Sequence, residues 1–260
     1  MEIDTREPRI LLWDIETSLE LAAVFDLKYN EFIDPANLVT ERYVICAAWK
    51  WLGAKQIHTT SVLDRPALFK KAPSNDQHVI RTLHNVLSQA DVIVAHNGDQ
   101  FDTKYVETRM LFHGLAPLPP ITSIDTCTVA KQRFKFNSNK LDYLGAFLNV
   151  GRKKPTTNGL WLRVLKGDRS AIREMVEYNK GDVALLERVF TKLRPYIANH
   201  VNRQLFGQTG CPRCGSPKIQ SRGTHRAISR VYQRWQCQAC GGWFRSAVND
   251  KRIKPAARVL

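Results

Sequence analysis

The chain has 260 residues, of which 43% are hydrophobic and 24% are charged, so its composition excludes wholesale disorder. No apolar run approaches the ~18 residues that a membrane span needs, and the charged start MEIDTREPRI is unlike a signal peptide. We therefore expect a soluble intracellular protein with one well-buried domain plus a small appendage.

The net charge of +15 is concentrated near the end of the sequence. Residues 1–200 carry 27 Lys and Arg against 23 Asp and Glu, whereas residues 201–260 carry 12 Lys and Arg against the single acid Asp250. Such concentrated positive charge favours a polyanionic partner, of which nucleic acid is the commonest. A solvated basic tail is the alternative.

Apolar runs in the first hundred residues predict four strands and a helix. The expected strands are 8–15, 43–52, 55–62 and 91–97, and the expected helix is 76–90. Gly53 supplies the turn between the second and third strands. The first three strands suggest an antiparallel meander.

The next hundred residues predict alternation of strand and helix. The expected elements are a helix over 101–115, a short strand entering a helix over 121–134, a helix over 138–150 and a long helix over 170–196. Gly114 ends the first helix, Ser138 caps the third, and Pro195 closes the last. A meander followed by such alternation predicts an α/β fold with a mixed sheet flanked by helices.

The composition changes near residue 196. The stretch ANHVNRQLFGQTG is typical of a linker, and a basic segment with paired cysteines follows it. We therefore expect a first domain over 1–197, a linker over 198–208 and a basic domain over 209–260.

An acidic pair ends the first predicted strand. Because side chains alternate along a strand, Asp14 and Glu16 project from one face, at the edge of a buried sheet, where they repel each other. Divalent metal ions offset such charge, and paired metals are a known way to run in-line phosphoryl displacement. Taken alone, an Asp-x-Glu pair is more typical of a capping or solvated pair.

Two later segments add acidic residues. Asp102 follows a polar turn at Asn97 and lies in the first turn of a predicted helix, where the helix dipole also favours an acid. Tyr178 and Asp182 stand four residues apart and share a helix face. Gly181, between them, lowers helix stability by about 1 kcal/mol relative to alanine. Close approach of another backbone or a ligand is a usual reason to keep a glycine at such a position.

The motifs DIE at 14–16, NGDQFD at 97–102 and YNKGD at 178–182 occur in order and resemble the three exonuclease motifs of the DEDDy 3'-to-5' exonucleases. This family belongs to the ribonuclease-H-like superfamily and includes the proofreading domains of DNA polymerases. The resemblance spans residues 8–195, and SIDTCTVAKQRF and NKLDYLGAFLNV look like inter-motif segments of phage and bacterial members. It implies a location in the cytoplasm of a bacterium or a phage-infected host.

The resemblance also implies roles for the motif residues. Asp14 bridges two Mg²⁺ or Mn²⁺ ions, Glu16 and Asp182 complete one coordination sphere, and Asp102 holds the other ion largely through water. Tyr178 orients the attacking water, since a tyrosine with a pKa near 10 is a poor base at neutral pH. The expected product is a nucleoside 5'-monophosphate.

Further residues are candidates for substrate binding. Thr17 is a candidate to bond the terminal nucleotide, with an ordinary strand threonine as the alternative. Asn97 and Phe101 match family positions where a substrate contact and a packing or stacking role are expected. The basic segments KQRFKFNSNK and GRKKPTTN either line the substrate groove or form solvated loops.

Four of the six cysteines form two Cys-x-x-Cys pairs separated by 22 residues, and glycine follows each pair. Glycine tolerates the positive φ of a zinc-knuckle turn, and metal is the economical explanation in a reducing compartment. Unpaired or redox cysteines are the alternative. We expect one structural Zn²⁺ in a zinc ribbon, with the ligands Cys211, Cys214, Cys237 and Cys240. The remaining Cys46 and Cys127 are expected in the core.

The predicted ribbon combines basic and aromatic residues. We expect phosphate contacts and stacking on a single strand from Arg226, Arg230, Arg234 and Trp235. A ribbon that docks on a protein is the alternative.

These features together predict a metal-dependent 3'-to-5' exonuclease that prefers single-stranded DNA to RNA. The alternatives are an exoribonuclease of the same fold, an endonuclease or transposase-like relative, and a non-catalytic nucleic-acid-binding zinc-ribbon protein. A replication or repair protein of a phage or mobile element is the expected context, with another replication or repair protein as a further partner and no membrane.

Overall fold

A mixed β-sheet lies at the centre of the fold. The computed structural model describes residues 7–24, 33–198, 200–228 and 230–247. Within them, a five-stranded sheet has the order β5-β4-β1-β6-β7, with β1 (Ile10–Thr17), β4 (Val44–Trp51), β5 (His58–Ser61), β6 (Val92–Ala95) and β7 (Thr122–Asp125). The β1–β4 and β4–β5 pairs are antiparallel, whereas β1–β6 and β6–β7 are parallel. The predicted meander and mixed sheet are confirmed.

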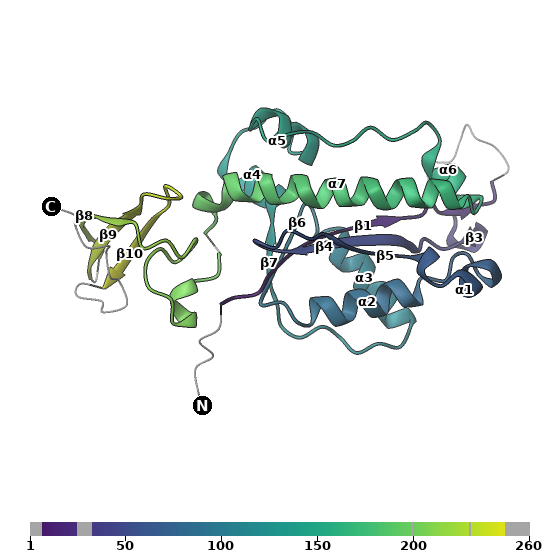
Figure 1. Ribbon diagram of the computed structural model, residues 1–260, viewed down its shortest axis with the longest axis horizontal. Helices are drawn as coiled ribbons and strands as arrows, with labels where there is room; N and C mark the ends of the chain where they lie inside the picture. Colours follow the sequence, from purple (N-terminus) through teal and green to yellow (C-terminus); the bar gives the residue numbers. More distant parts are fainter. Residues whose placement is uncertain (1–6, 25–32, 199, 229, 248–260) are drawn as a thin grey trace.

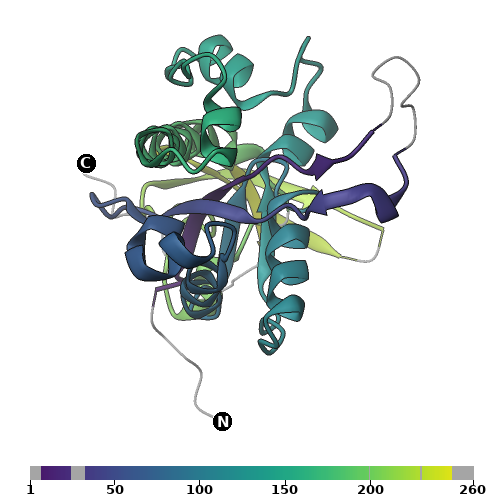
Figure 2. The same cartoon turned by 90° about the vertical axis from the view of Figure 1, so that its right-hand side faces the viewer.

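Helices cover both faces of this sheet (Figure 1). α7 (Arg169–Leu193) runs along one face, while α2 (Gln77–Leu87) and α3 (Asp102–Phe112) lie on the other. Figure 2 looks along α7, drawn in green, and shows blue helices on the opposite side of the strands. The other α-helices of the described residues are α1 (Pro66–Lys71), α4 (Thr126–Arg133), α5 (Leu141–Phe147) and α6 (Leu160–Leu165).

The alternation along β1 decides which face carries its acidic residues. Trp13 packs in a core with α2 and α3, whereas Ile10 and Leu12 pack with the second half of α7. Because successive side chains point to opposite faces, Asp14 and Glu16 continue the face of Leu12. Both acids therefore lie on the side of the sheet that α7 covers.

The predicted cap of α5 is wrong. The helix begins at Leu141, and Ser138 only accepts a hydrogen bond from the backbone N–H of Lys140 at 3.3 Å. The carbonyl of Asn139 accepts a hydrogen bond from Nε2 of His96 at 2.8 Å. Because this contact ties residue 139 to the turn after β6, the chain stays extended up to residue 140 and the helix starts later.

Several short elements were not predicted. They are β2 (Leu21–Ala22), β3 (Leu38–Thr40), α1, α6 and the 3-10 helices η1 (Pro35–Asn37), η2 (Val62–Asp64) and η4 (Arg203–Phe206), while η3 (Arg194–Tyr196) forms the end of the predicted long helix. Each is too short to show a hydrophobic period. Within the described ranges, no helix combines the length and the apolar character that crossing a membrane requires.

A second sheet lies beyond the carboxyl end of α7 (Figure 1). It is antiparallel, has the order β10-β9-β8, and comprises β8 (Ile219–Arg226), β9 (Val231–Cys237) and β10 (Trp243–Ala247). The predicted linker contains η4 and is therefore folded. Residues 1–6 and 25–32 of the predicted first domain, position 199 of the linker, and 229 and 248–260 of the basic domain, including Asp250, lie outside the described residues.

Two arginines join the small sheet to the end of α7. Arg194 donates a hydrogen bond from Nη2 to the carbonyl of Arg213. Arg213 in turn donates from Nε to the carbonyl of Ile197 at 3.2 Å and from Nη1 to the carbonyl of Trp243 at 2.7 Å. The two sheets are thus connected by side-chain contacts as well as by the chain.

Candidate active site and cysteine cluster

Three carboxylates from distant parts of the sequence meet between β1 and α7. Asp14 and Glu16 lie two residues apart on β1, and Asp182 lies midway along α7. One oxygen from each carboxylate lies within 4.8 Å of the other two. The structure therefore brings together three of the four acids that the sequence motifs singled out.

Asp102 borders this cluster at the first position of α3. Its side chain is 2% exposed, and its Oδ1 accepts a hydrogen bond from the backbone N–H of Ile15 at 3.0 Å. After burial, the charge of Asp102 is the largest cause that raises the pKa of Asp14. Asp102 thus lies within electrostatic reach of the cluster without joining it.

The turn before α3 uses residues suited to its backbone. Asn97 has a φ of 66°, in the left-handed region that asparagine tolerates, and its N–H donates to Oδ1 of Asp125 at 2.9 Å. A Cβ on Gly98 would lie 2.3 Å from Cβ of Ala95 and 3.7 Å from Oδ2 of Asp102. Only glycine fits there, so the turn can pass close to the acid.

Burial raises the pKa values of all four acids, and repulsion by other acids of the cluster adds to this for Asp14 and Glu16. Burial, followed by the charge of Asp182, raises the pKa of Glu16 to about 8, and burial raises the pKa of Asp102 to about 7. Burial is also the largest cause that raises the pKa of Asp14 and of Asp182. A nearby cation would favour the ionised form of these carboxylates.

The cluster fits hard divalent cations. Asn179, which is fully buried, donates from Nδ2 to Oδ2 of Asp14 at 2.6 Å. Among the described residues, Oδ1 of Asp182 and Oδ1 of Asn179 are buried without a hydrogen-bond partner. An unpaired buried oxygen is costly, and clustered carboxylate oxygens are the ligands that Mg²⁺ and Mn²⁺ prefer. The donor set therefore suits such ions.

Lys153, in the basic segment GRKKPTTN that sequence analysis left open as groove lining or solvated loop, lies in the cluster. Nζ of Lys153 donates to Oδ2 of Asp182 at 2.6 Å and to the hydroxyl of Tyr178 at 3.2 Å. Burial works against the charge of Lys153, but Asp182 outweighs it, so the pKa of Lys153 rises above its ordinary value. Burial and the charge of Asp182 likewise raise the pKa of Tyr178. The site thus contains a built-in cation.

The loop that carries Lys153 is fixed by Asp142 of α5. Oδ1 of Asp142 accepts from the backbone N–H of Lys153 at 2.9 Å, and Arg152 pairs with Oδ2 at 2.5 Å. Gly151 has a φ of 123°, which a side chain would strain. The glycine and the basic residues of GRKK indicated a turn with positive charge. A single lysine in a loop has no spacing that would identify it as a functional residue.

The remaining predicted residues of this region lie around the cluster. Thr17 ends β1, directly after a register shift at Glu16, and is 8% exposed. The ring of Phe101, just before α3, packs 4.8 Å from that of Tyr105. Substrate roles for Thr17, Asn97 and Phe101 stay predictions.

Of the two reasons expected for Gly181, close approach of another backbone is wrong, and close approach of a ligand stays a prediction. A Cβ at this position would first meet the side chain of Lys154, at an ordinary contact distance of 3.7 Å. The neighbour is a flexible stem from the loop that carries Lys153, so alanine is sterically compatible with this position.

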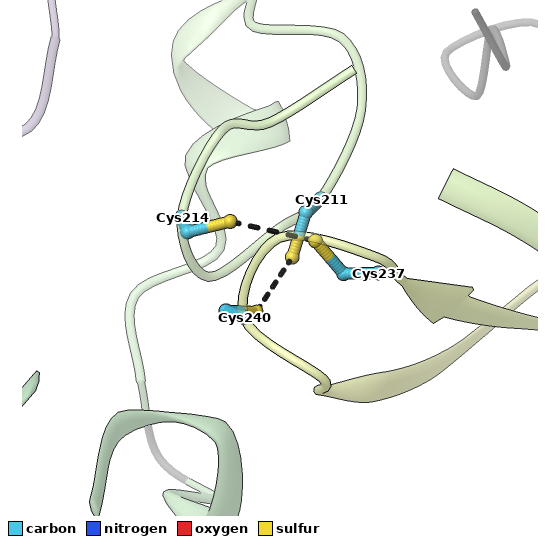
Figure 3. Close-up of side chains that lie close together, drawn as sticks. All are labelled: Cys211, Cys214, Cys237 and Cys240. Atoms are coloured by element: carbon cyan, nitrogen blue, oxygen red, sulfur yellow. Dashed lines mark hydrogen bonds between the residues drawn. The ribbon is translucent and has the colours of Figure 1, made fainter. Parts of the chain in front are cut away.

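The cysteines of the two Cys-x-x-Cys pairs converge at one end of the small sheet (Figure 3). The sulfur atoms of Cys211 and Cys240 lie 3.8 Å apart, and those of Cys214 and Cys237 lie 3.6 Å apart. Four sulfurs at about 2.3 Å from one zinc ion are about 3.8 Å apart in a tetrahedron. The cluster therefore fits Zn²⁺.

Glycine supplies the turn after each cysteine pair, as predicted. Gly215 and Gly241 have φ values of 76° and 75°. Cys46 and Cys127 are buried in the first part of the chain, away from the four-cysteine cluster. The Cys-x-x-Cys spacing thus correctly distinguished the four clustered cysteines from the two buried cysteines of the core.

The predicted nucleic-acid contacts of the small sheet differ in exposure. Arg226, Arg230 and Arg234 are exposed. Trp235 packs against the cysteine cluster and donates from Nε1 to Oγ of Ser246 at 3.0 Å. Trp235 thus contributes to the core of the small sheet, and stacking on a base stays a prediction.

The fold and the acidic cluster together define a class of protein. The family model of the RNase H superfamily matches residues 51–194, more than half of the chain, so the chain belongs to this superfamily. The match begins after β1 and therefore does not include the first acidic pair.

A solved structure gives a more particular likeness. The chain resembles the family B DNA polymerase from the hyperthermophilic archaeon Pyrobaculum calidifontis, with a TM-score of 0.51 and 16% identity. The similarity covers 78% of this chain and 27% of the polymerase chain, so the chain spans about a quarter of the polymerase. At this identity the likeness shows a shared fold. No curated protein matches the sequence.

Proposed function

We propose that this protein is a DEDDy-type 3'-to-5' exonuclease that releases nucleoside 5'-monophosphates from single-stranded DNA. The observation that carries this proposal is the convergence of Asp14, Glu16 and Asp182, with Asp102 at the edge, in an RNase H-like fold. The likeness to a DNA polymerase supports DNA as the substrate.

The same acids would hold two divalent ions. Asp14 would be shared between the two ions, Glu16 and Asp182 would help to hold one of them, and Asp102 would help to hold the other. Two bound Mg²⁺ or Mn²⁺ ions activate the attacking water and stabilise the leaving 3' oxygen. The unpaired buried Oδ1 of Asp182 supports this ligand set.

The other residues of the site would position these groups. The raised pKa of Tyr178 keeps its hydroxyl protonated at neutral pH, so it can donate a hydrogen bond that orients water. Nζ of Lys153 donates hydrogen bonds to both the hydroxyl of Tyr178 and the carboxylate of Asp182, so it holds the two side chains in place. Asn179 fixes the carboxylate of Asp14. Lys153 and Asn179 are therefore positioning residues, whereas Tyr178, which would contact the attacking water, is a catalytic residue.

The small sheet would be a structural zinc ribbon that helps to bind nucleic acid. Its four cysteines would hold one Zn²⁺ in a closed site, and a segment this small needs the metal to fold. We divide the chain into an exonuclease domain over 1–197, a linker over 198–208 and the ribbon over 209–260. Replication or repair is the proposed context.

The test is digestion of matched 5'-labelled single-stranded DNA and RNA with Mg²⁺ or Mn²⁺. Wild type should give a ladder that shortens from the 3' end of DNA, and Asp14→Ala should abolish it. Asp102→Asn should lose most activity, whereas Glu107→Gln, an exposed acid on the same helix, should keep it.

Each other outcome changes the assignment. Faster digestion of RNA would make the protein an exoribonuclease. Intact substrate with tight binding would leave a non-catalytic nucleic-acid-binding protein. Full activity of Asp14→Ala would disprove the proposed metal site.

A further inference from the structure

A groove separates the end of α7 from the small sheet. It encloses about 950 Å³ and is lined by cationic and aromatic side chains from both parts, namely Arg133, Lys192, Arg194, Arg213, Tyr196 and Trp243. No Asp or Glu is among the described residues that line it, and Cys214 and Cys240 of the four-cysteine cluster form part of its wall. These residues come from α4, the carboxyl end of α7 and the small sheet, and Figure 1 shows how the small sheet follows α7.

The cationic residues of the groove divide into two kinds. Arg194 and Arg213 donate to backbone carbonyls and hold the two walls together. Arg133 and Lys192 are exposed, and in the described part of the chain neither has an ion-pair or hydrogen-bond partner. These two unpaired positive charges favour binding of an anionic ligand in the groove.

Aromatic side chains lie exposed beside these charges. Tyr196 is 56% exposed and Trp243 is 49% exposed, which is unusual for large aromatic residues in a groove. A single-stranded nucleic acid offers both phosphates for the cations and bases for the rings. A protein partner would need acidic groups instead of bases.

The segment 134–140 connects this groove with the acidic cluster. At the groove, the ring of Phe134 packs 5.1 Å from that of Tyr196. At its other end, Asn139 is hydrogen-bonded to His96, which directly precedes the turn of Asn97. The segment also carries the exposed Lys135 and Lys140.

The aromatic contacts continue along this segment. Phe134 packs 5.2 Å from Phe136, which packs 5.1 Å from Phe147 of α5. Phe147 is 59% exposed. A row of rings with interleaved lysines therefore runs from the groove to α5, the helix whose Asp142 holds the loop of Lys153.

We infer that this surface binds the part of a single strand that lies on the 5' side of the nucleotide being removed. The basic track comprises Arg133, Lys135, Lys140, Lys192, Tyr196 and Trp243. The inference rests on the proposed exonuclease, whose 3' terminus would lie at the acidic cluster. Ten residues of α7 separate Asp182 from Lys192, a distance of about 15 Å, so a dinucleotide cannot fill the track.

The inference predicts binding that depends on substrate length. With Asp14→Asn protein, which keeps substrate intact, fluorescence anisotropy should show that a strand of about 12 nucleotides binds at least about 10-fold tighter than one of about 3. Adding Arg133→Glu and Lys192→Glu should remove this advantage. Each phosphate contact on a single strand contributes about 0.7 to the slope of log affinity against log salt concentration. Loss of two contacts should therefore lower the magnitude of this slope by about 1.4.

A matched variant controls for net charge. Lys70→Glu with Lys71→Glu makes the same charge change on the exposed surface of α1, at the opposite end of the molecule (Figure 1), and should keep the length dependence. Thermal unfolding should confirm that both double variants fold. Tyr196→Ala with Trp243→Ala should weaken binding of the long strand while leaving the salt slope unchanged.

The two proposals fail in different ways. Affinity that does not depend on length, or that survives Arg133→Glu with Lys192→Glu, would overturn the basic track even if the enzyme is active. Wild-type hydrolysis of a small chromogenic phosphodiester, thymidine 5'-p-nitrophenyl phosphate, reports on the acidic cluster alone. Absence of that hydrolysis, with length-dependent binding intact, would overturn the exonuclease and leave a track that binds single strands. Anisotropy measurements with matched DNA and RNA strands show whether the basic track prefers one nucleic acid over the other.

Discussion

Nζ of Lys153 lies 2.6 Å from Oδ2 of Asp182, so a loop lysine neutralises part of the charge that three clustered carboxylates create. The same atom donates to Tyr178 at 3.2 Å. The loop that connects α5 with α6 therefore reaches the acidic cluster, even though none of the sequence motifs lies in it.

Lys153→Met should lower kcat. The substitution keeps the length of the side chain but removes the donor that fixes Tyr178 and Asp182, and misplacing such groups costs about 10- to 100-fold. Lys154→Met, a change to the neighbouring lysine, should have little effect. Equal activity of the two variants, measured on single-stranded DNA at saturating Mg²⁺, would show that Lys153 only neutralises charge in the metal-free protein.

Tyr178→Phe should reduce turnover by about 10-fold or more while the Mg²⁺ concentration for half-maximal activity stays nearly constant. The hydroxyl is lost, but the ring and the four carboxylates remain. The measurement is kcat as a function of Mg²⁺. Unchanged turnover would mean that Tyr178 serves only packing.

Glu16 should make the protein less stable as the pH rises, when no Mg²⁺ or Mn²⁺ is added. Its pKa is raised from 4.5 to about 8, so between these values the folded chain keeps a proton that the unfolded chain releases. The stabilisation is therefore full below the lower pKa and is lost as the pH rises through the higher one. Relative to Glu16→Gln, the Tm of wild type should fall across this window.

The comparison with Glu16→Gln cancels the titration of groups that do not interact with Glu16. Burial lowers the pKa of His200 to about 4, and this group makes stability rise with pH between that value and 6.5. Because both proteins contain His200, its effect cancels in the difference of Tm. A difference that stays constant between about pH 5 and about pH 8 would contradict the assigned pKa of Glu16.

Cys237→Ser should abolish the bound zinc and unfold the small sheet. Metal analysis should give about one Zn²⁺ for wild type and none for the variant, since a structural site needs all four ligands. Limited proteolysis should then cleave within residues 211–247. Cys127→Ala should retain zinc, and retention of zinc by Cys237→Ser would exclude a four-cysteine site.

The sequence predicted those parts of the site that local rules govern. The period of a strand put Asp14 and Glu16 on one face, and the period of a helix put Tyr178 beside Asp182. Glycine after each cysteine pair predicted the turns at Gly215 and Gly241. Each of these features depends on neighbours within a few residues.

Features that depend on distant contacts were not predicted. Lys153 enters the site because Asp142 fixes its backbone, and Ser138 fails as a cap because His96 holds Asn139. Neither contact leaves a pattern in the sequence. The groove beside Lys192 depends on how the small sheet lies against α7, which no spacing encodes.

The long helix α7 has a mechanical consequence. It is 25 residues long, about 38 Å, carries Tyr178 and Asp182 near its middle, and continues directly into Arg194, which contacts the small sheet. A continuous helix that is held at one end transmits force along its axis to the residues at its centre. If the small sheet binds a strand as proposed, tension on that strand would therefore reach Asp182, and the rate of the proposed cleavage should change with the applied force.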